Sequence, residues 1–389
     1  MYKRQVINFI APSFTWPETK TLNLTYDRQM GDWLMTATYL HSDQEEALYK
    51  IIDGSPLSGD QPLTPTLKAP DGRPIYNQTG RNTYKGGLYT DDGGERDVFS
   101  VAFSRYFNDG DGSFSVGYTH QDIQELSGMA STTANSSYGK YAASDFNNRT
   151  PGRSIYETEH RFFATMSSTH YFFGADKPTT FNLFFERKSG LPGTYTWDTF
   201  ERSISRYQTR AFGYENNLND DSAHLLYIPT GLTDPNVCWG SCGGAPDLVV
   251  ANEVINLLHN QLGLASYAGQ ILPTGVFEYP WQTTLDLKIT QILPGFRADD
   301  EFVISLGIEN LLNLIDSDKG EIRYGSYTGT VDVLDMQMSN DFSKYIYPRS
   351  RGGADYAFRF NPNNPQEIRK SAVNSIWRAQ LGFTYKFSF

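Results

Sequence analysis

Apolar and polar side chains alternate along nine separate stretches of the chain. The clearest stretch is residues 379–389 (A-Q-L-G-F-T-Y-K-F-S-F), in which every second side chain is apolar. Successive side chains of a β-strand point to opposite faces of the sheet, so this period of two predicts a strand with one apolar and one polar face. A half-buried edge strand is the alternative interpretation. The other eight stretches lie within residues 21–28, 33–39, 99–103, 114–118, 157–172, 181–185, 281–289 and 302–308.

The connections between these predicted strands alternate in length. Short turns, such as residues 29–32 and 174–177, follow the odd-numbered strands, whereas long excursions follow the even-numbered ones. The long excursions are residues 53–95, 126–156, 190–280 and 314–375. Outer-membrane β-barrels have short periplasmic turns and long extracellular loops. The pattern therefore predicts an all-β fold, namely an antiparallel transmembrane β-barrel whose last strand runs from the extracellular side to the periplasm.

The number of predicted strands is odd, whereas single-chain bacterial barrels have an even number. We therefore expect the chain to be the C-terminal part of a larger barrel. Residues 1–5 (M-Y-K-R-Q) resemble a translated transposon adapter, and the short apolar patch after them is too short for a signal peptide. A genuine, unusual N-terminus is the alternative. The predicted organisation is a non-native start, residues 1–5, followed by a barrel portion with long extracellular loops, residues 6–389.

Composition agrees with a membrane-embedded β-protein. Aromatic residues make up 14% of the chain, yet the mean hydropathy is only −0.48, which suits aromatic girdles combined with polar loops and a polar lumen. No apolar run reaches the length of about 18 residues that a membrane-spanning helix needs. The net charge is −11 and no basic stripe is present, so we expect no nucleic-acid partner.

The long excursions contain weaker signals. Residues 247–264 have the apolar spacing of a short helix within a loop. Residues 206–208 are candidates to pair with 225–227, and residues 332–338 with 356–360. Cys238 and Cys242 lie in C-W-G-S-C and would close a small disulfide loop in an oxidising compartment, with two free thiols as the alternative.

Motifs of catalysis are absent from the sequence. There is no G-x-S-x-G, no H-E-x-x-H, no phosphate-binding glycine loop and no dinucleotide fingerprint. The histidines show no catalytic arrangement in the sequence; they are His41, His120, His160, His170, His224 and His259. We therefore predict no enzymatic activity, and no catalytic residue, cofactor or metal site.

Several segments resemble those of one family of membrane proteins. The pattern formed by Gln380, Gly382, Tyr385, Phe387 and Phe389 resembles the terminal signal by which outer-membrane proteins are recognised for barrel assembly. Further segments resemble, in their order, the C-terminal barrel half of TonB-dependent outer-membrane receptors of the Oar-like, carboxypeptidase-regulatory-like type. They include L-N-L-T-Y-D-R-Q (22–29), L-Y-I-P (226–229), L-D-L-K-I (285–289), G-I-E-N-L-L-N (307–313) and I-W-R-A-Q-L-G (376–382).

This resemblance implies a barrel of about 22 strands around an N-terminal plug that is missing here. It implies a receptor in the bacterial outer membrane that actively imports a bulky ligand, which the sequence does not identify. The implied partners are outer-membrane lipid, the barrel-assembly machinery, and TonB, contacted through the missing plug region.

Some polar residues of the predicted barrel wall are candidates to face the lumen. They are Asp286, Lys288, Glu309, Arg378 and Lys386; the alternative is that they solvate the wall or pair across strands. For ligand capture, the candidate loop region contains Ser136, Ser137, Tyr138 and Tyr141. The main rival function is a passive outer-membrane porin-like barrel; an outer-membrane enzyme and a secreted all-β binding protein are further rivals.

Overall fold

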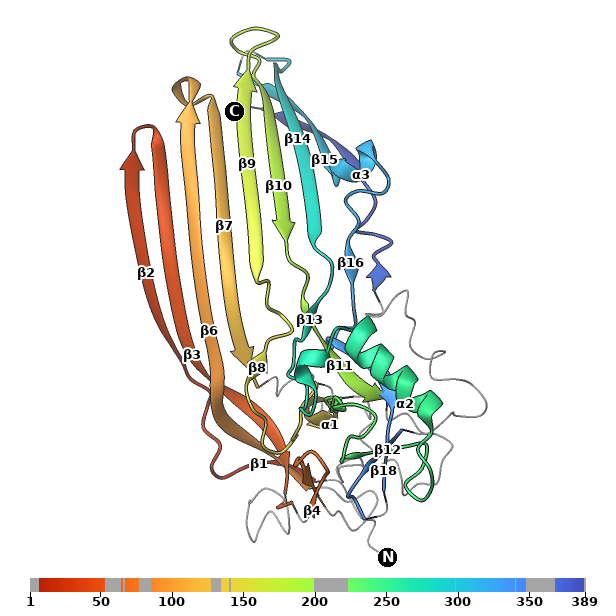
Figure 1. Ribbon diagram of the computed structural model, residues 1–389. Coiled ribbons are helices and arrows are strands. Elements are labelled where there is room, and N and C mark those ends of the chain that lie inside the picture. Colours follow the sequence, from red (N-terminus) through yellow and green to blue (C-terminus); the bar gives the residue numbers. More distant parts are fainter. Residues whose placement is uncertain are drawn as a thin grey trace, which may run out of the picture.

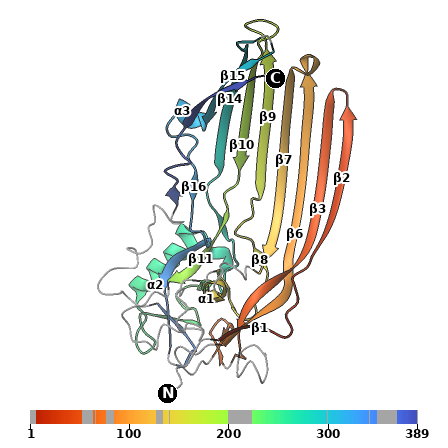
Figure 2. The ribbon, with the colours of Figure 1, turned by 180° about the vertical axis from the view of Figure 1, so that it is seen from behind.

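The computed structural model consists of a long, curved β-sheet with a folded lobe at one end (Figure 1). Figure 2 shows the same arrangement from behind. The structure describes residues 7–52, 64–65, 67–76, 85–126, 134–139, 141–198, 223–297, 299–339, 341–347 and 368–387. Within these residues, no helix is long and apolar enough to cross a membrane.

Nine antiparallel strands follow one another along the main path of the sheet. Each contains or overlaps one of the nine alternating stretches, which confirms the prediction of an all-β fold. In order they are β2 (Thr19–Met30), β3 (Trp33–Ile51), β6 (Lys85–Phe107), β7 (Gly112–Glu125), β9 (His160–His170), β10 (Thr179–Lys188), β14 (Gln282–Pro294), β15 (Glu301–Glu309) and β21 (Arg378–Lys386). Strands β2 and β21 lie at the two ends of this path, and no ladder joins them among the described residues, so the described sheet is open.

The hairpins at the end of the sheet away from the lobe are short because their turns reach left-handed backbone angles. In the β2–β3 turn, Gly31 has φ of 61°, which glycine adopts at little steric cost. Between β6 and β7, the short helix η1 (Asn108–Gly110) contains Asp109 at φ 51° and Gly110 at φ 101°. Asp and Gly are the residue types that tolerate these angles, so the predicted short turns agree with the structure.

The first long excursion is shorter than predicted. Strand β3 continues to Ile51 and pairs with a β6 strand that already begins at Lys85, rather than near residue 95. A bulge between Gln44 and Glu45 shifts the register within this long pair. Bulges bend and twist a strand, and the alternation of the sequence stops there. The predicted start of the excursion at residue 53 therefore agrees with the end of β3 at Ile51, whereas its predicted end near residue 95 was wrong because β6 already begins at Lys85.

The lobe is built from segments of the long connections. Its strands include β11 (Pro192–Asp198), β12 (Val237–Trp239), β17 (Thr330–Asp335) and β19 (Tyr345–Tyr347). Strand β11 pairs in parallel with β17, and β12 in parallel with β19. Within residues 332–338, Asp332, Leu334 and Asp335 pair with β11. The predicted partners 356–360, like residues 206–208, lie outside the described residues, so both predicted pairings stay predictions.

A hydrophobic core lies inside the lobe. Its largest fully buried side chains include Trp197, Tyr227, Tyr345, Tyr347 and Leu258. Tyr345 contacts both Trp197 and Tyr227, with ring centroids 4.9 and 5.8 Å apart respectively. The predicted loops are therefore packed against one another as a folded unit.

The helix predicted within residues 247–264 is present. It consists of α2 (Leu248–Ile255), which continues into a π-helical turn, η2 (Asn256–Gln261). The Asp247 carboxylate caps α2 by accepting hydrogen bonds from the backbone N–H groups of Val249 and Val250, which otherwise have no partner within the helix. Val250 and Val254 are buried in the lobe core, and their spacing is the helical period that the sequence showed.

Short elements complete the described structure. They are β1 (Ile7–Ile10), β4 (Leu67–Lys68), β5 (Pro74–Ile75), α1 (Ala134–Gly139), β8 (Gly152–Arg153), η3 (Ala265–Tyr267), β13 (Phe277–Glu278), α3 (Leu311–Ile315), β16 (Arg323–Tyr324), β18 (Gln337–Met338) and β20 (Arg369–Lys370). Strand β1 pairs in parallel with β6, and β8 pairs with β7 close to the lobe.

Candidate functional site

One face of the sheet is apolar and exposed. On the outermost strands, Leu24 is 57% exposed and Phe383 is 61% exposed. Cross-strand register carries apolar side chains over the sheet, for example from Tyr26 on β2 to Ala37 on β3 and Val101 on β6. Monomeric soluble proteins rarely expose a contiguous apolar surface of this kind, and such surfaces mark contacts with protein partners or membranes.

Aromatic and charged side chains border the apolar face at both ends. Away from the lobe, Trp33 packs edge-on against Phe114, and Arg105 forms a 2.7 Å ion pair with Asp32. Near the lobe, Trp281 stacks on His160 and Phe162, and the guanidinium of Arg187 lies over Trp281. Apolar surface between two aromatic borders is the pattern of a membrane-embedded wall.

The opposite face of the sheet carries small and polar side chains. One row of the ladder runs from Ser113 through Ser167, Asn182, Lys288 and Gly307 to Gln380. A cavity of about 690 Å³ lies against this face. Asp286, Lys288 and Glu309, three of the five lumen candidates, line this cavity together with Gln380 and Gly382.

The lumen candidates also pair across neighbouring strands. Glu309 and Arg378 form a 2.7 Å ion pair, and both side chains are more than half exposed. Lys386 forms a 3.0 Å pair with Glu301. The Asp286 carboxylate accepts a 2.8 Å hydrogen bond from the backbone N–H of Asn310, the residue before α3. Glu309, Arg378 and Lys386 therefore pair across strands, as in the alternative interpretation. Arg378 and Lys386 are not among the residues that line the cavity.

The candidate assembly signal is split between the two faces of β21. Gln380 and Gly382 line the cavity on the polar face. Tyr385 alternates to the apolar side, where its ring contacts Phe296 and Phe387. Its hydroxyl donates to the Asp300 carboxylate and accepts a hydrogen bond from the Phe296 backbone. Phe389 lies outside the described residues, so recognition of this signal by an assembly machinery stays a prediction.

A second cavity, of about 590 Å³, lies where the lobe meets the sheet. Its lining combines aromatic, cationic and acidic side chains, including Tyr156, Tyr327, Arg323, Arg369 and Asp332. Convergent polar groups in a partly apolar cavity are typical of ligand sites.

The predicted capture region is mostly interior. Ser137, Tyr138 and Tyr141 are buried in the lobe, because packed tyrosine rings bury a large apolar area while their hydroxyls find partners. Tyr138 donates to the Asn147 side chain at 3.0 Å, and Tyr141 bonds Tyr156 at 2.7 Å. These residues therefore support the lobe, and only Tyr156, their neighbour, reaches the second cavity.

A buried ion pair lies beneath the lobe core. The side chains of Arg73 and Asp71 are 0% and 2% exposed, with a 2.7 Å ion pair between them. Arg73 also donates a 2.9 Å hydrogen bond to the Leu225 carbonyl and lies over the Trp197 ring. Buried charges are costly unless they are paired and hydrogen-bonded, and Arg73 meets both conditions. Its contact with the Trp197 ring links residues 71–73 to β11.

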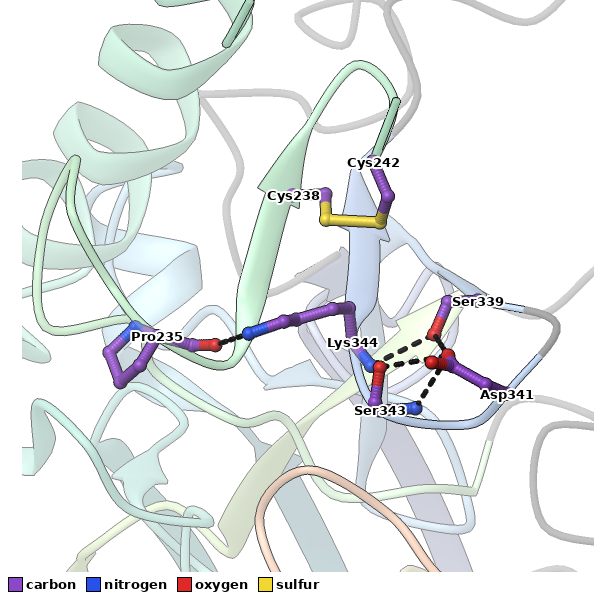
Figure 3. The surroundings of a disulfide bond; sticks show 7 residues. All are labelled: Pro235, Cys238, Cys242, Ser339, Asp341, Ser343 and Lys344. Carbon is purple, nitrogen blue, oxygen red and sulfur yellow. Dashed lines mark hydrogen bonds between the residues drawn. A yellow bond between two sulfur atoms is a disulfide. The ribbon is translucent and has the colours of Figure 1, made fainter. Parts of the chain in front are cut away.

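A disulfide joins Cys238 to Cys242 at the lobe surface (Figure 3), with Cα atoms 5.1 Å apart. In the adjoining turn, Asp341 accepts hydrogen bonds from the hydroxyls of Ser339 and Ser343, at 2.7 and 2.8 Å. These bonds, led by that from Ser339, lower the pKa of Asp341 to about 2. The Lys344 ammonium donates to the Pro235 carbonyl, which ties β19 to the segment before β12.

Sequence reasoning missed one cluster. The pairing of β7 with β9 sets His120 directly opposite His160, with Glu159 beside them. His160 lies within the predicted stretch 157–172 and His120 just after the stretch 114–118. Only the register between the strands shows that they meet, because a shift of one residue would place them on opposite faces.

Neither a family model nor a curated protein matches this chain. The resemblance to TonB-dependent receptors therefore stays a prediction from the sequence.

Proposed function

We propose that the chain forms part of the wall and the external cap of a bacterial outer-membrane receptor that imports a bulky ligand. The observation that carries the proposal is the exposed apolar face of the nine-strand sheet, bordered at both ends by aromatic and charged residues. Lipid is the partner that fits such a face, because it offers apolar contact over the middle of each strand and polar contact at its ends.

The lobe and the polar face supply the parts that a receptor needs. The cavity lined by Arg323, Arg369 and Asp332 lies where the lobe meets the sheet, so a ligand held there would be close to the polar face. The cavity lined by Asp286, Lys288 and Glu309 continues the polar surface along that face. The family resemblance supports active, TonB-driven import over passive diffusion.

The test of the membrane-facing wall uses spin labels at adjacent positions of one central strand. Cysteines replace Leu183 and Asn182 in turn, in a background in which Cys238 and Cys242 are serine, and the full chain is placed in lipid-containing micelles. We expect the label at 183 to be accessible to oxygen and the label at 182 to a water-soluble nickel chelate. Equal accessibility of the two labels to both reagents would remove the basis of the proposal.

The rival of a complete, passive porin-like barrel differs in its behaviour on gels. A closed barrel migrates differently before and after heating, whereas a sheet with two open edges is costly in lipid unless another chain covers those edges. We expect no heat-modifiable monomer from this chain alone. A monodisperse, heat-modifiable monomer with steady conductance would favour the porin-like barrel.

A further inference from the structure

We infer that His120, Glu159 and His160 form a binding site for a divalent transition-metal ion of the zinc class. His120 on β7 is the ladder partner of His160 on β9, and β8 pairs with β7 a few residues further along. Strands β7, β8 and β9 meet close to the lobe (Figure 1). One ligand atom from each of the three residues lies within 4.8 Å of the other two. Imidazole nitrogen and carboxylate oxygen are the donors that zinc takes in sites of two histidines and one glutamate.

The hydrogen bonds of the two histidines prepare their Nε2 atoms as ligands. His120 Nδ1 lies 3.1 Å from the backbone carbonyl oxygen of Glu159. A carbonyl only accepts, so Nδ1 carries the proton and the lone pair of the neutral ring is on Nε2. His160 Nδ1 is bonded to the Tyr118 hydroxyl at 2.9 Å. Metal-binding histidines characteristically engage the other ring nitrogen in this way, which fixes the tautomer and the ring orientation.

The carboxylate ligand is held as firmly as the imidazoles. Glu159 Oε1 lies 3.3 Å from His160 Nε2, and Glu159 Oε2 accepts a 2.6 Å hydrogen bond from Arg153. Arg153 also pairs with Glu157 and Glu278. Three carboxylates, those of Glu157, Glu159 and Glu278, therefore meet one guanidinium, so acidic groups outnumber basic ones beside the site, which favours a cation despite the nearby arginine.

A second cluster of ligand-type residues lacks this preparation. His41, Glu95 and Asp97 also lie close together. However, each ring nitrogen of His41 lies close to a carboxylate. Nδ1 is 3.0 Å from the Asp97 carboxylate and Nε2 is 3.5 Å from that of Asp43. A ring between two carboxylates is stabilised as the imidazolium, which has no lone pair for a metal.

The site would leave coordination positions open. Zinc prefers four ligands, and three come from the protein, so water or an external group completes the shell. An ion there would link β7 to β9 at the border of the lobe.

The test is a calorimetric titration of the full chain in detergent micelles with Zn²⁺ alone. We expect one saturable site. Tyr118→Phe, which removes only the orienting hydroxyl, should weaken binding about tenfold, and His120→Asn and His160→Asn should weaken it further. The matched control is His170→Asn, on the same strand but outside the cluster, which should bind as tightly as the native chain.

A second readout does not depend on the folding of the ligand variants. The Trp281 ring stacks on His160 at 6.0 Å between centroids, so Cu²⁺ bound at this site should quench Trp281 fluorescence, and the quenching should be lost in Trp281→Phe. The absence of saturable Zn²⁺ binding by the native chain would overturn the inference. So would equal weakening in His170→Asn and His120→Asn, or Cu²⁺ quenching that survives in Trp281→Phe.

Discussion

The sheet and the lobe use the same aromatic residues in opposite ways. On the sheet, Tyr26 is 56% exposed and Phe99 is 44% exposed, although both lie in regular strands. In the lobe, Trp197 and Tyr345 are fully buried among short, irregular segments. Burial of apolar area stabilises the lobe as it does any water-soluble protein, whereas the sheet leaves its apolar face exposed. The comparison teaches that aromatic content alone does not distinguish a buried core from an exposed apolar face.

The largest effect should come from emptying the lobe core. Trp197→Ala removes a fully buried ring and should lower the free energy of unfolding of the lobe by about 3–5 kcal/mol. The measurement is chemical denaturation, monitored by near-ultraviolet circular dichroism. The control is Trp16→Ala, at a side chain that is 84% exposed, and an equal loss there would contradict the difference between the two regions.

On the sheet, introducing a charged side chain should lower the stability of the protein on the apolar face only. Leu183→Lys places an ammonium on the apolar face of β10 and should destabilise the chain in a lipid environment by about 2–4 kcal/mol. Asn182→Lys places the same charge on the opposite, polar face of β10 and should destabilise the chain far less. Denaturant unfolding in lipid-containing micelles measures both, and similar costs would show that the two faces meet the same surroundings.

High pH should destabilise the lobe through its buried tyrosines. Burial, together with a hydrogen bond to Asp234, raises the pKa of Tyr227 from 10.0 to about 12. The folded state favours the neutral phenol, so this contribution is fully present below pH 10 and is lost as the pH rises through about 12. A shift of this size corresponds to about 3 kcal/mol. Thermal unfolding as a function of pH measures it, and Tyr227→Phe should reduce the dependence.

The disulfide should make a smaller, local contribution. Cys238→Ser with Cys242→Ser should reduce the stability of the lobe by about 2 kcal/mol, because the closed loop is short. Thermal unfolding of the double variant and of the reduced native chain, each compared with the oxidised native chain, measures the effect. A loss much larger than that caused by reduction would indicate that the serines disturb the packing themselves.

The smallest effect should come from the exposed pair on the polar face. Glu309→Gln removes one partner of the pair with Arg378 and should change stability by about 0–1 kcal/mol, less at high salt. Denaturant unfolding at two salt concentrations checks this, with Glu301→Gln as a second exposed pair for comparison. A loss of several kcal/mol would assign Glu309 a structural role beyond surface pairing.

The sequence predicted the sheet better than the lobe, for a physical reason. In a strand such as β21, the period of two is a local property of the sequence. Each strand of the sheet could therefore be predicted without knowledge of its partners. Strand β17 pairs with β11 in parallel, and a pairing between segments so distant leaves no local pattern. The α2 helix was the exception, because its apolar spacing is local.

For the candidate sites, too, local features could be predicted from the sequence and contacts between distant segments could not. Asp286 and Lys288 were identified because alternation within one strand assigns a face. The meeting of His120 with His160 depends on the register between two strands, and the cavity near Arg323 depends on the packing of the lobe. Sequence alone determines neither.

The parallel pairing of β11 with β17 also constrains the order in which the protein takes shape. Thr194 on β11 is a partner of Thr330 on β17, and the hairpin of β14 and β15 lies between them in the chain. The lobe therefore cannot close when its first strands are synthesised, and β11 waits with its apolar side chains uncovered until that hairpin has been completed. Closing so long a loop is slow.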